Sequence, residues 1–122
     1  MKKRPAVIFL EDILQAIKKI EKYTNDLNYE RFRSDEKSVD AVIRNLEIIG
    51  EASKNIPSEL KDKFPQIPWK KMMGLRNIVA HEYFGIDLKI IWEIASENLP
   101  EVKLRIESIL KKEHGGKNST KK

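Results

Sequence analysis

The sequence predicts an all-α fold, an up-down bundle of four to five main helices. Apolar residues recur at the i, i+3, i+4, i+7 spacing of a core-facing helix in several long segments. No segment alternates apolar and polar residues over the length of a strand. Prolines and turn-forming residues separate the periodic segments. A chain of 122 residues suits one domain with a single core, which we place at residues 1–112.

The first two helices are predicted by apolar stripes. Residues 5–23 carry a stripe that consists of Leu10, Ile13, Leu14 and Ile17. A second helix is expected from about Asp35 to Ile56, capped by Ser34 or Asp35 and ended by Pro57. Its stripe consists of Val39, Val42, Ile43, Leu46 and Ile49. Between the two helices, "YERFRS" is either a loop or one irregular helical turn.

Prolines divide the second half of the chain. The connector "IPSELKDKFPQIP" holds three of them and allows a short helix over residues 58–63. A third helix is expected from near Trp69 until Gly85 breaks it. Asp87 can cap a fourth helix, which Pro100 kinks or restarts. Residues 113–122 have the composition of a disordered basic tail.

Composition excludes several kinds of chemistry. The chain has no cysteine, so disulfides, thiolate zinc sites and cysteine nucleophiles are excluded. No apolar run approaches the roughly 20 residues that span a bilayer, and "AVIFL" is too short for a secretory signal. We therefore expect a cytoplasmic protein that does not enter a membrane. The formal net charge is +5, and the positive charge is concentrated at the two ends, where it is available to nucleic acid or simply solvated.

The stretch "LRNIVAHEYFG" gathers polar groups within an apolar segment: Arg76, Asn77, His81 and Tyr83. If the third helix continues through the stretch, residues 77 and 81 are i, i+4 neighbours, and residues 76 and 83 share a face seven residues apart. All four side chains can then border one small polar patch.

Such a patch suits cleavage of a phosphodiester. His81 can transfer a proton near neutral pH, and the planar cation of Arg76 matches phosphate oxygens. RNA supplies its own nucleophile, the 2′-hydroxyl, so the reaction needs no metal and no cofactor. Asn77 could orient His81 or the phosphate, and Tyr83 could bond phosphate or stack on a base.

Structural roles explain the same residues, and an arginine–histidine pair in a helix is more often structural than catalytic. Arg76 could pair with a nearby carboxylate, and Tyr83 could pack in the core or at an interface. His81 and Glu82 do not form a zinc site by themselves, because two further ligands are missing. Glu51, Arg44 and Glu47 lie along one helical face and suggest a salt-bridged surface.

The residues of this stretch resemble the motif of a known family. "RNIVAHEYF" is similar to the R-x4-H-x-Y motif of HEPN-domain proteins, specifically the HepT-like toxins. The likeness covers residues 7–110 and includes "LEDILQAIKKIEKYT", "AVIRNLEIIGEASKNIP" and the closing "IESIL". It implies a helical bundle that forms a homodimer, so that two copies of the motif meet in one RNA-cleaving cleft.

The resemblance also implies an activity and a partner. It implies a metal-independent endoribonuclease toxin without a cofactor, in which Arg76 and His81 are catalytic and Asn77 supports the site. The implied partner is an MntA-like nucleotidyltransferase antitoxin, which inactivates the toxin by transferring AMP to Tyr83. An alternative remains open: a non-catalytic helical dimer that serves as binding partner or substrate of a nucleotidyltransferase.

Overall fold

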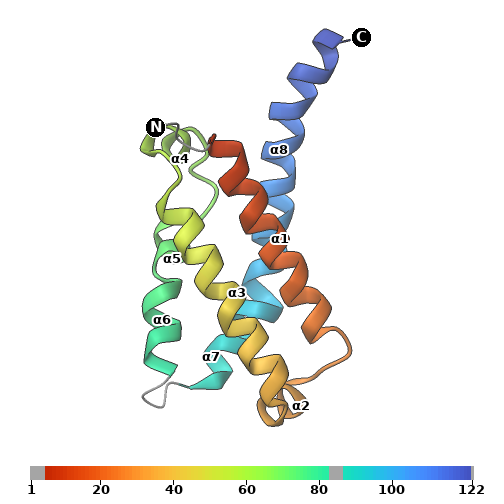
Figure 1. Ribbon diagram of the computed structural model, residues 1–122, viewed down its shortest axis with the longest axis vertical. Helices are drawn as coiled ribbons and strands as arrows, with labels where there is room; N and C mark the ends of the chain where they lie inside the picture. Colours follow the sequence, from red (N-terminus) through yellow and green to blue (C-terminus); the bar gives the residue numbers. More distant parts are fainter. Residues whose placement is uncertain (1–4, 83–86, 122) are drawn as a thin grey trace.

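Helices account for all the regular secondary structure that the computed structural model describes (Figure 1). The description covers the backbone of residues 5–82 and 87–121 and the side chains of residues 5–80 and 87–112. The elements are α1 (Ala6–Thr24), α2 (Tyr29–Ser34), α3 (Glu36–Lys54), α4 (Ser58–Lys63), α5 (Trp69–Met73), α6 (Leu75–Glu82), α7 (Leu88–Glu93), the π-helical turn η1 (Ile94–Asn98) and α8 (Leu99–Lys121). The all-α prediction is confirmed.

The body of the molecule consists of α1, α3, the consecutive pair α5 and α6, and α8. α1 and α3 pack against each other; α5 and α6 lie along α3 on one side, and α8 contacts α1 on the other (Figure 1). The long helices therefore enclose one core. In the part of the chain that the structure describes, no helix combines the length and the apolar character needed to cross a bilayer.

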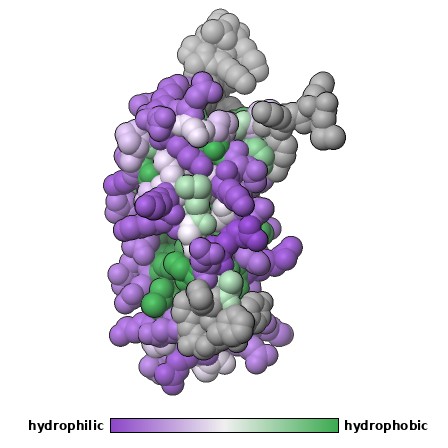
Figure 2. Space-filling model, turned by 90° about the vertical axis from the view of Figure 1, so that its left-hand side faces the viewer, coloured by the Kyte–Doolittle hydropathy of each residue, from purple (hydrophilic) through white to green (hydrophobic). Residues whose placement is uncertain are grey.

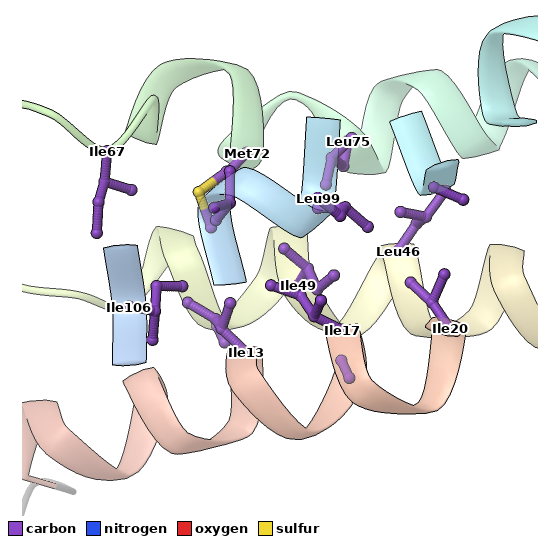
Figure 3. Close-up of a cluster of buried hydrophobic side chains, with 14 of the residues drawn as sticks. Ile13, Ile17, Ile20, Leu46, Ile49, Ile67, Met72, Leu75, Leu99 and Ile106 are labelled. Carbon is purple, nitrogen blue, oxygen red and sulfur yellow. The ribbon is translucent and has the colours of Figure 1, made fainter. Parts of the chain in front are cut away.

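The core joins residues that are far apart in the sequence. Figure 3 shows apolar side chains of α1, α3, α5, α6 and α8, and of the connector before α5, meeting in one cluster. The labelled members are Ile13, Ile17, Ile20, Leu46, Ile49, Ile67, Met72, Leu75, Leu99 and Ile106. Fully burying one such side chain contributes about 1.5–3 kcal/mol. The stripe predicted for α1 is confirmed except at Leu14, which is only partly buried, and Ala16 and Ile20 complete it.

Side-chain caps fix where three of the helices begin. Asn28 accepts a hydrogen bond from the Arg31 amide at 2.9 Å, so "YERFRS" is a helical turn rather than a loop. Asp35 begins α3 by accepting from the backbone and hydroxyl of Ser38, at 3.4 and 2.8 Å. Asp87 begins α7 by accepting from the Lys89 amide at 2.9 Å. The caps predicted at Asp35 and Asp87 are confirmed, as is the short helix over residues 58–63.

Two interruptions modify the predicted helices. The expected third helix is divided into α5 and α6 at Gly74, which ends α5 in a near-helical conformation (φ −74°, ψ −8°). Gly85, the residue predicted to break this helix, lies outside the described residues. The restart expected at Pro100 is confirmed, because the Leu99 amide bonds to the carbonyl of Ile94, five residues back. The wider π turn gives room to a proline ring that would crowd an α-helical turn.

The C-terminal segment forms α8, the longest of the described helices. The backbone of α8 is helical as far as Lys121. Earlier in α8, Lys103 forms an ion pair with Glu21 of α1, with 2.8 Å between Nζ and Oε1. The hydrogen bond to Glu21 holds the pKa of Lys103 above its usual value.

Candidate functional site

The motif helix, α6, has one buried and one exposed side. Leu75 and Val79 enter the core, whereas Arg76 and Asn77 are exposed. A helix of 8 residues is too short to be stable alone in water, so it depends on packing against its neighbours, chiefly α3. Figure 2 views the face on which α5 and α6 lie; hydrophilic side chains cover much of it, and hydrophobic ones gather on part of it.

The backbone settles part of the predicted motif geometry. It is helical from Leu75 to Glu82, so residues 77 and 81 lie one turn apart on the same helix. The helix therefore continues through His81, as the predicted patch requires. The side chain of His81 and the whole of Tyr83 lie outside the described residues. Of the four predicted site residues, the structure places the side chains of Arg76 and Asn77.

Arg76 forms an ion pair with a carboxylate of the neighbouring helix. Its Nη1 lies 2.9 Å from Oε1 of Glu51 on α3, and the two side chains are 49% and 57% exposed. A carboxylate partner for Arg76 was one of the structural alternatives that the sequence left open. Because the pair is exposed, the guanidinium is also accessible to a second anion from solvent.

A glycine allows this contact to form. Gly50 is buried on α3 directly under the Arg76 side chain. A Cβ atom at position 50 would lie 2.9 Å from Cγ of Arg76 and 3.2 Å from its backbone nitrogen. Real Cβ atoms essentially never lie as close as the first of these distances, and the second is tighter than most real contacts. The absence of a side chain at Gly50 therefore determines how near α6 comes to α3.

An apolar groove runs along the other flank of α6. It has a volume of about 390 Å³ and lies between α5 and α6 on one side and η1 and α8 on the other. Leu75, Ile78 and Leu99 contribute to its apolar lining, and Lys71 and Arg105 add positive charge. Among the described side chains, no cluster of three or more His, Asp or Glu residues is arranged to hold a metal ion.

Sequence reasoning did not identify Gly50 and Glu51 as parts of this site. Glu51 was assigned to a salt-bridged surface with Arg44 and Glu47, which are also on α3. The feature of the sequence that could have indicated this contact is Gly50, a glycine inside a predicted helix. Glycine within a helix costs about 1 kcal/mol relative to alanine, so its presence there points to close packing or to a functional reason.

Comparisons with known proteins agree with this architecture. The family model described as "Ribonuclease HepT-like" matches residues 13–109. "Putative RNase MJ1380" of Methanocaldococcus jannaschii is 45% identical over 109 residues, which cover 89% of this chain and 100% of that protein. "Probable ribonuclease HepT" of Thermococcus cleftensis is 45% identical over 109 residues, covering 89% and 99% of the two chains.

A bacterial relative gives a similar result. "Putative RNase TTE0752" of Caldanaerobacter subterraneus is 40% identical over 105 residues, covering 86% of this chain and 94% of its own. No solved structure gives a significant match. The chain belongs to the HepT-like ribonuclease family of HEPN-type helical domains.

Proposed function

We propose that this protein is a metal-independent endoribonuclease toxin of a HepT/MntA-type toxin–antitoxin system. The observation that carries the proposal is the exposed pair Arg76 and Asn77 on α6, on the same helix as His81, in a member of a ribonuclease family. An exposed arginine can reach a phosphate of RNA without any rearrangement of the core. The names of the relatives support RNA as the substrate.

The proposed reaction is an internal transesterification. The 2′-hydroxyl of RNA loses its proton to a base and attacks the adjacent phosphorus. The 2′-oxygen bond to phosphorus forms, and the bond to the 5′-oxygen breaks as an acid gives that oxygen a proton. The products are a 2′,3′-cyclic phosphate and a 5′-hydroxyl. His81 transfers a proton, Arg76 stabilises the charge on phosphate, and Asn77 supports the site.

A homodimer completes this mechanism. The reaction needs both an acid and a base, whereas the motif of one copy supplies a single histidine, His81. Two copies that pair through the motif helix would bring two histidines into one cleft. The apolar groove beside α6 offers surface that such an interface could cover.

The proposed antitoxin is an MntA-like nucleotidyltransferase that transfers AMP to Tyr83. In that reaction the Tyr83 oxygen attacks the α-phosphorus of ATP, pyrophosphate leaves, and the phenolic proton is lost to a base. The added phosphodiester would compete with RNA phosphate for Arg76, and the adenosine would block the cleft. Modification would therefore stop cleavage without unfolding the protein.

The ion pair of Arg76 favours an alternative in which the protein does not cleave RNA. An arginine that is already engaged with Glu51 is compatible with a purely structural role. The protein would then be a non-catalytic helical dimer that binds, or is modified by, a nucleotidyltransferase. Substitution at the motif separates the two functions.

We predict that Arg76→Ala and His81→Ala each abolish RNA cleavage and leave the fold intact. Loss of a proton-transfer group typically lowers the rate on the order of 100- to 10,000-fold. Cleavage of a labelled RNA is measured in EDTA, and circular dichroism verifies the fold. Cleavage by wild-type protein in EDTA, with cyclic phosphate ends, supports the mechanism. Retained activity in His81→Ala, or activity lost to the chelator alone, contradicts it.

A second prediction concerns Tyr83. Incubation with ATP, magnesium and a nucleotidyltransferase encoded beside the gene should add AMP to Tyr83 and stop cleavage. Peptide mass spectrometry locates the modification, and Tyr83→Phe is the matched control that retains the ring but cannot be modified. Full modification of Tyr83 with undiminished cleavage would contradict the proposed inactivation. Modification only at Tyr23 or Tyr29 would contradict it as well.

A further inference from the structure

We propose that Gly50 and Glu51, adjacent residues of α3, are positioning residues that hold the Arg76 guanidinium in its working orientation. The inference rests on the proposed ribonuclease function, which it extends from the motif helix to the helix behind it. Neither residue is part of the R-x4-H-x-Y motif. Both act on Arg76, one by its missing side chain and one by its charge.

Gly50 fixes the base of the arginine side chain. The position of a Cβ at residue 50 is only 2.9 Å from Cγ of Arg76, 3.2 Å from its backbone nitrogen and 3.4 Å from the carbonyl of Met72. The first methylenes of Arg76 therefore lie against the α3 backbone itself. Two of these three neighbours are backbone atoms, which cannot turn aside as the end of a flexible side chain can. A larger residue would displace α6 together with Arg76.

Glu51 fixes the other end of the same side chain. A free arginine side chain populates many rotamers, so its guanidinium would sample many positions. The contact of 2.9 Å between Nη1 and Oε1 of Glu51 reduces that freedom. Because Gly50 and Glu51 are consecutive, one turn of α3 holds Arg76 at both ends.

The carboxylate and a substrate phosphate can contact Arg76 at the same time. A guanidinium presents several N–H donors in a planar fork, and Glu51 engages one of its terminal nitrogens, Nη1. The remaining donors are available to phosphate, since the Arg76 side chain is 49% exposed. Glu51 therefore acts as an orienting partner and not as a competitor for substrate. If Glu51 orients Arg76, neutralising the carboxylate should slow RNA cleavage; if Glu51 competes with phosphate, neutralising it should speed cleavage.

The first experiment replaces Glu51 by glutamine in the full chain. Positioning predicts that kcat for RNA cleavage falls roughly two- to fivefold, the change in population expected when one exposed ion pair is lost, while KM does not rise. Competition predicts instead that kcat/KM increases. Glu21→Gln is the matched control, because it breaks the ion pair to Lys103, another pair between two helices, without touching Arg76. A kcat for Glu51→Gln equal to or above that of wild type overturns the proposal.

A spectroscopic measurement tests the positioning without using activity. Nitrogen-15 relaxation of the Arg76 Nε–H group, assigned by its loss in Arg76→Lys, reports how ordered the side chain is in the absence of RNA. The group should be ordered in wild type and in Glu21→Gln and mobile in Glu51→Gln. Equal mobility in all three proteins overturns the proposal even if RNA is cleaved. A wild-type protein with an ordered Arg76 and no cleavage would count against the ribonuclease function and leave the orientation of Arg76 by Glu51 supported.

Gly50→Ala tests the other half of the arrangement. The added methyl should displace Arg76 and lower kcat about tenfold or more, since misplacement of a catalytic group by about 1 Å can cost on the order of 100-fold. Gly74→Ala is the matched control, because its Cβ would meet only ordinary contacts of 3.4 and 3.5 Å. Activities are compared at a temperature where circular dichroism shows both variants fully folded. A Gly50→Ala variant as active as Gly74→Ala would overturn the role of Gly50.

Discussion

At the scale of single residues, the described part of the core contains a buried side-chain hydroxyl that makes no hydrogen bond. The hydroxyl of Ser53 on α3 is fully buried, and it forms no hydrogen bond with any of the described residues. Asn45, the other buried polar residue found there, donates to the carbonyl of Ala41 at 2.8 Å. A buried hydroxyl that makes no hydrogen bond lowers stability, because folding removes it from water without replacing the lost interaction.

We therefore predict that Ser53→Ala stabilises the protein. The free energy of unfolding should rise by up to about 1 kcal/mol, since the change removes an unsatisfied group and adds a better helix former. Urea unfolding followed by circular dichroism measures the effect. Ser38→Ala provides the comparison, because its hydroxyl is hydrogen-bonded to Asp35 and its loss should lower stability. A destabilised Ser53→Ala would indicate that the hydroxyl does have a partner.

The residue scale also shows what the sequence could predict of the site. Arg76 and Asn77 were identified because their side chains carry chemistry within a recognisable spacing. Gly50 contributes by lacking a side chain, and Glu51 resembles the other exposed acids of α3. Their importance depends on which helix packs against α3 and in what register. That information is not contained in local spacing, so only the structure reveals the pairing of Glu51 with Arg76.

At the scale of helices, the residues that cap or break helices were the most informative part of the sequence. Asp35 and Asp87 cap their helices as predicted, because a capping carboxylate acts on amides only two or three residues away. The break at Gly74 was not predicted, since its conformation is nearly helical and its sequence context resembles a helix interior. The interruption at Pro100 was predicted, because its ring crowds an α-helical turn, but spacing alone does not show that the interruption takes the form of the π turn η1.

The Asp35 cap should make stability depend on pH. Hydrogen bonds from the hydroxyl and amide of Ser38 hold the pKa of Asp35 below its usual value. The stabilisation from this group is therefore present above the unfolded-state pKa, and it is lost as the pH falls through the lower folded-state pKa. Asp35→Ala should be less stable than wild type at pH 7, and the difference should shrink in acid. Urea unfolding at several pH values measures it.

Asp35→Asn separates the cap from its charge. The amide oxygen of asparagine can still accept from Ser38 but does not titrate. This variant should keep part of the stabilisation without the acid dependence. A gap between wild type and Asp35→Ala that stays constant from pH 7 to strongly acidic pH would contradict the assignment.

At the scale of the whole molecule, we predict a homodimer that includes α6 in its interface. Light scattering at micromolar concentration should give twice the chain mass of 14.3 kDa. Ile78→Asp places a charge in the groove beside α6 and should favour the monomer and reduce RNA cleavage together. Leu104→Asp is the control on α8, where the side chain is already 66% exposed. A wild-type protein that is strictly monomeric, or an Ile78→Asp dimer of unchanged affinity, would contradict this interface.

The packing of α1 against α8 has a consequence for synthesis of the chain. The two helices meet through the core and through Glu21 and Lys103, which are 82 positions apart. A chain that emerges from a ribosome with its N-terminus first presents the apolar stripe of α1 long before α8 exists to cover it. The core, and with it the support for α6, can be completed only after α8 has been made. A ribonuclease built in this way would remain inactive on the messenger that encodes it until α8 has been made.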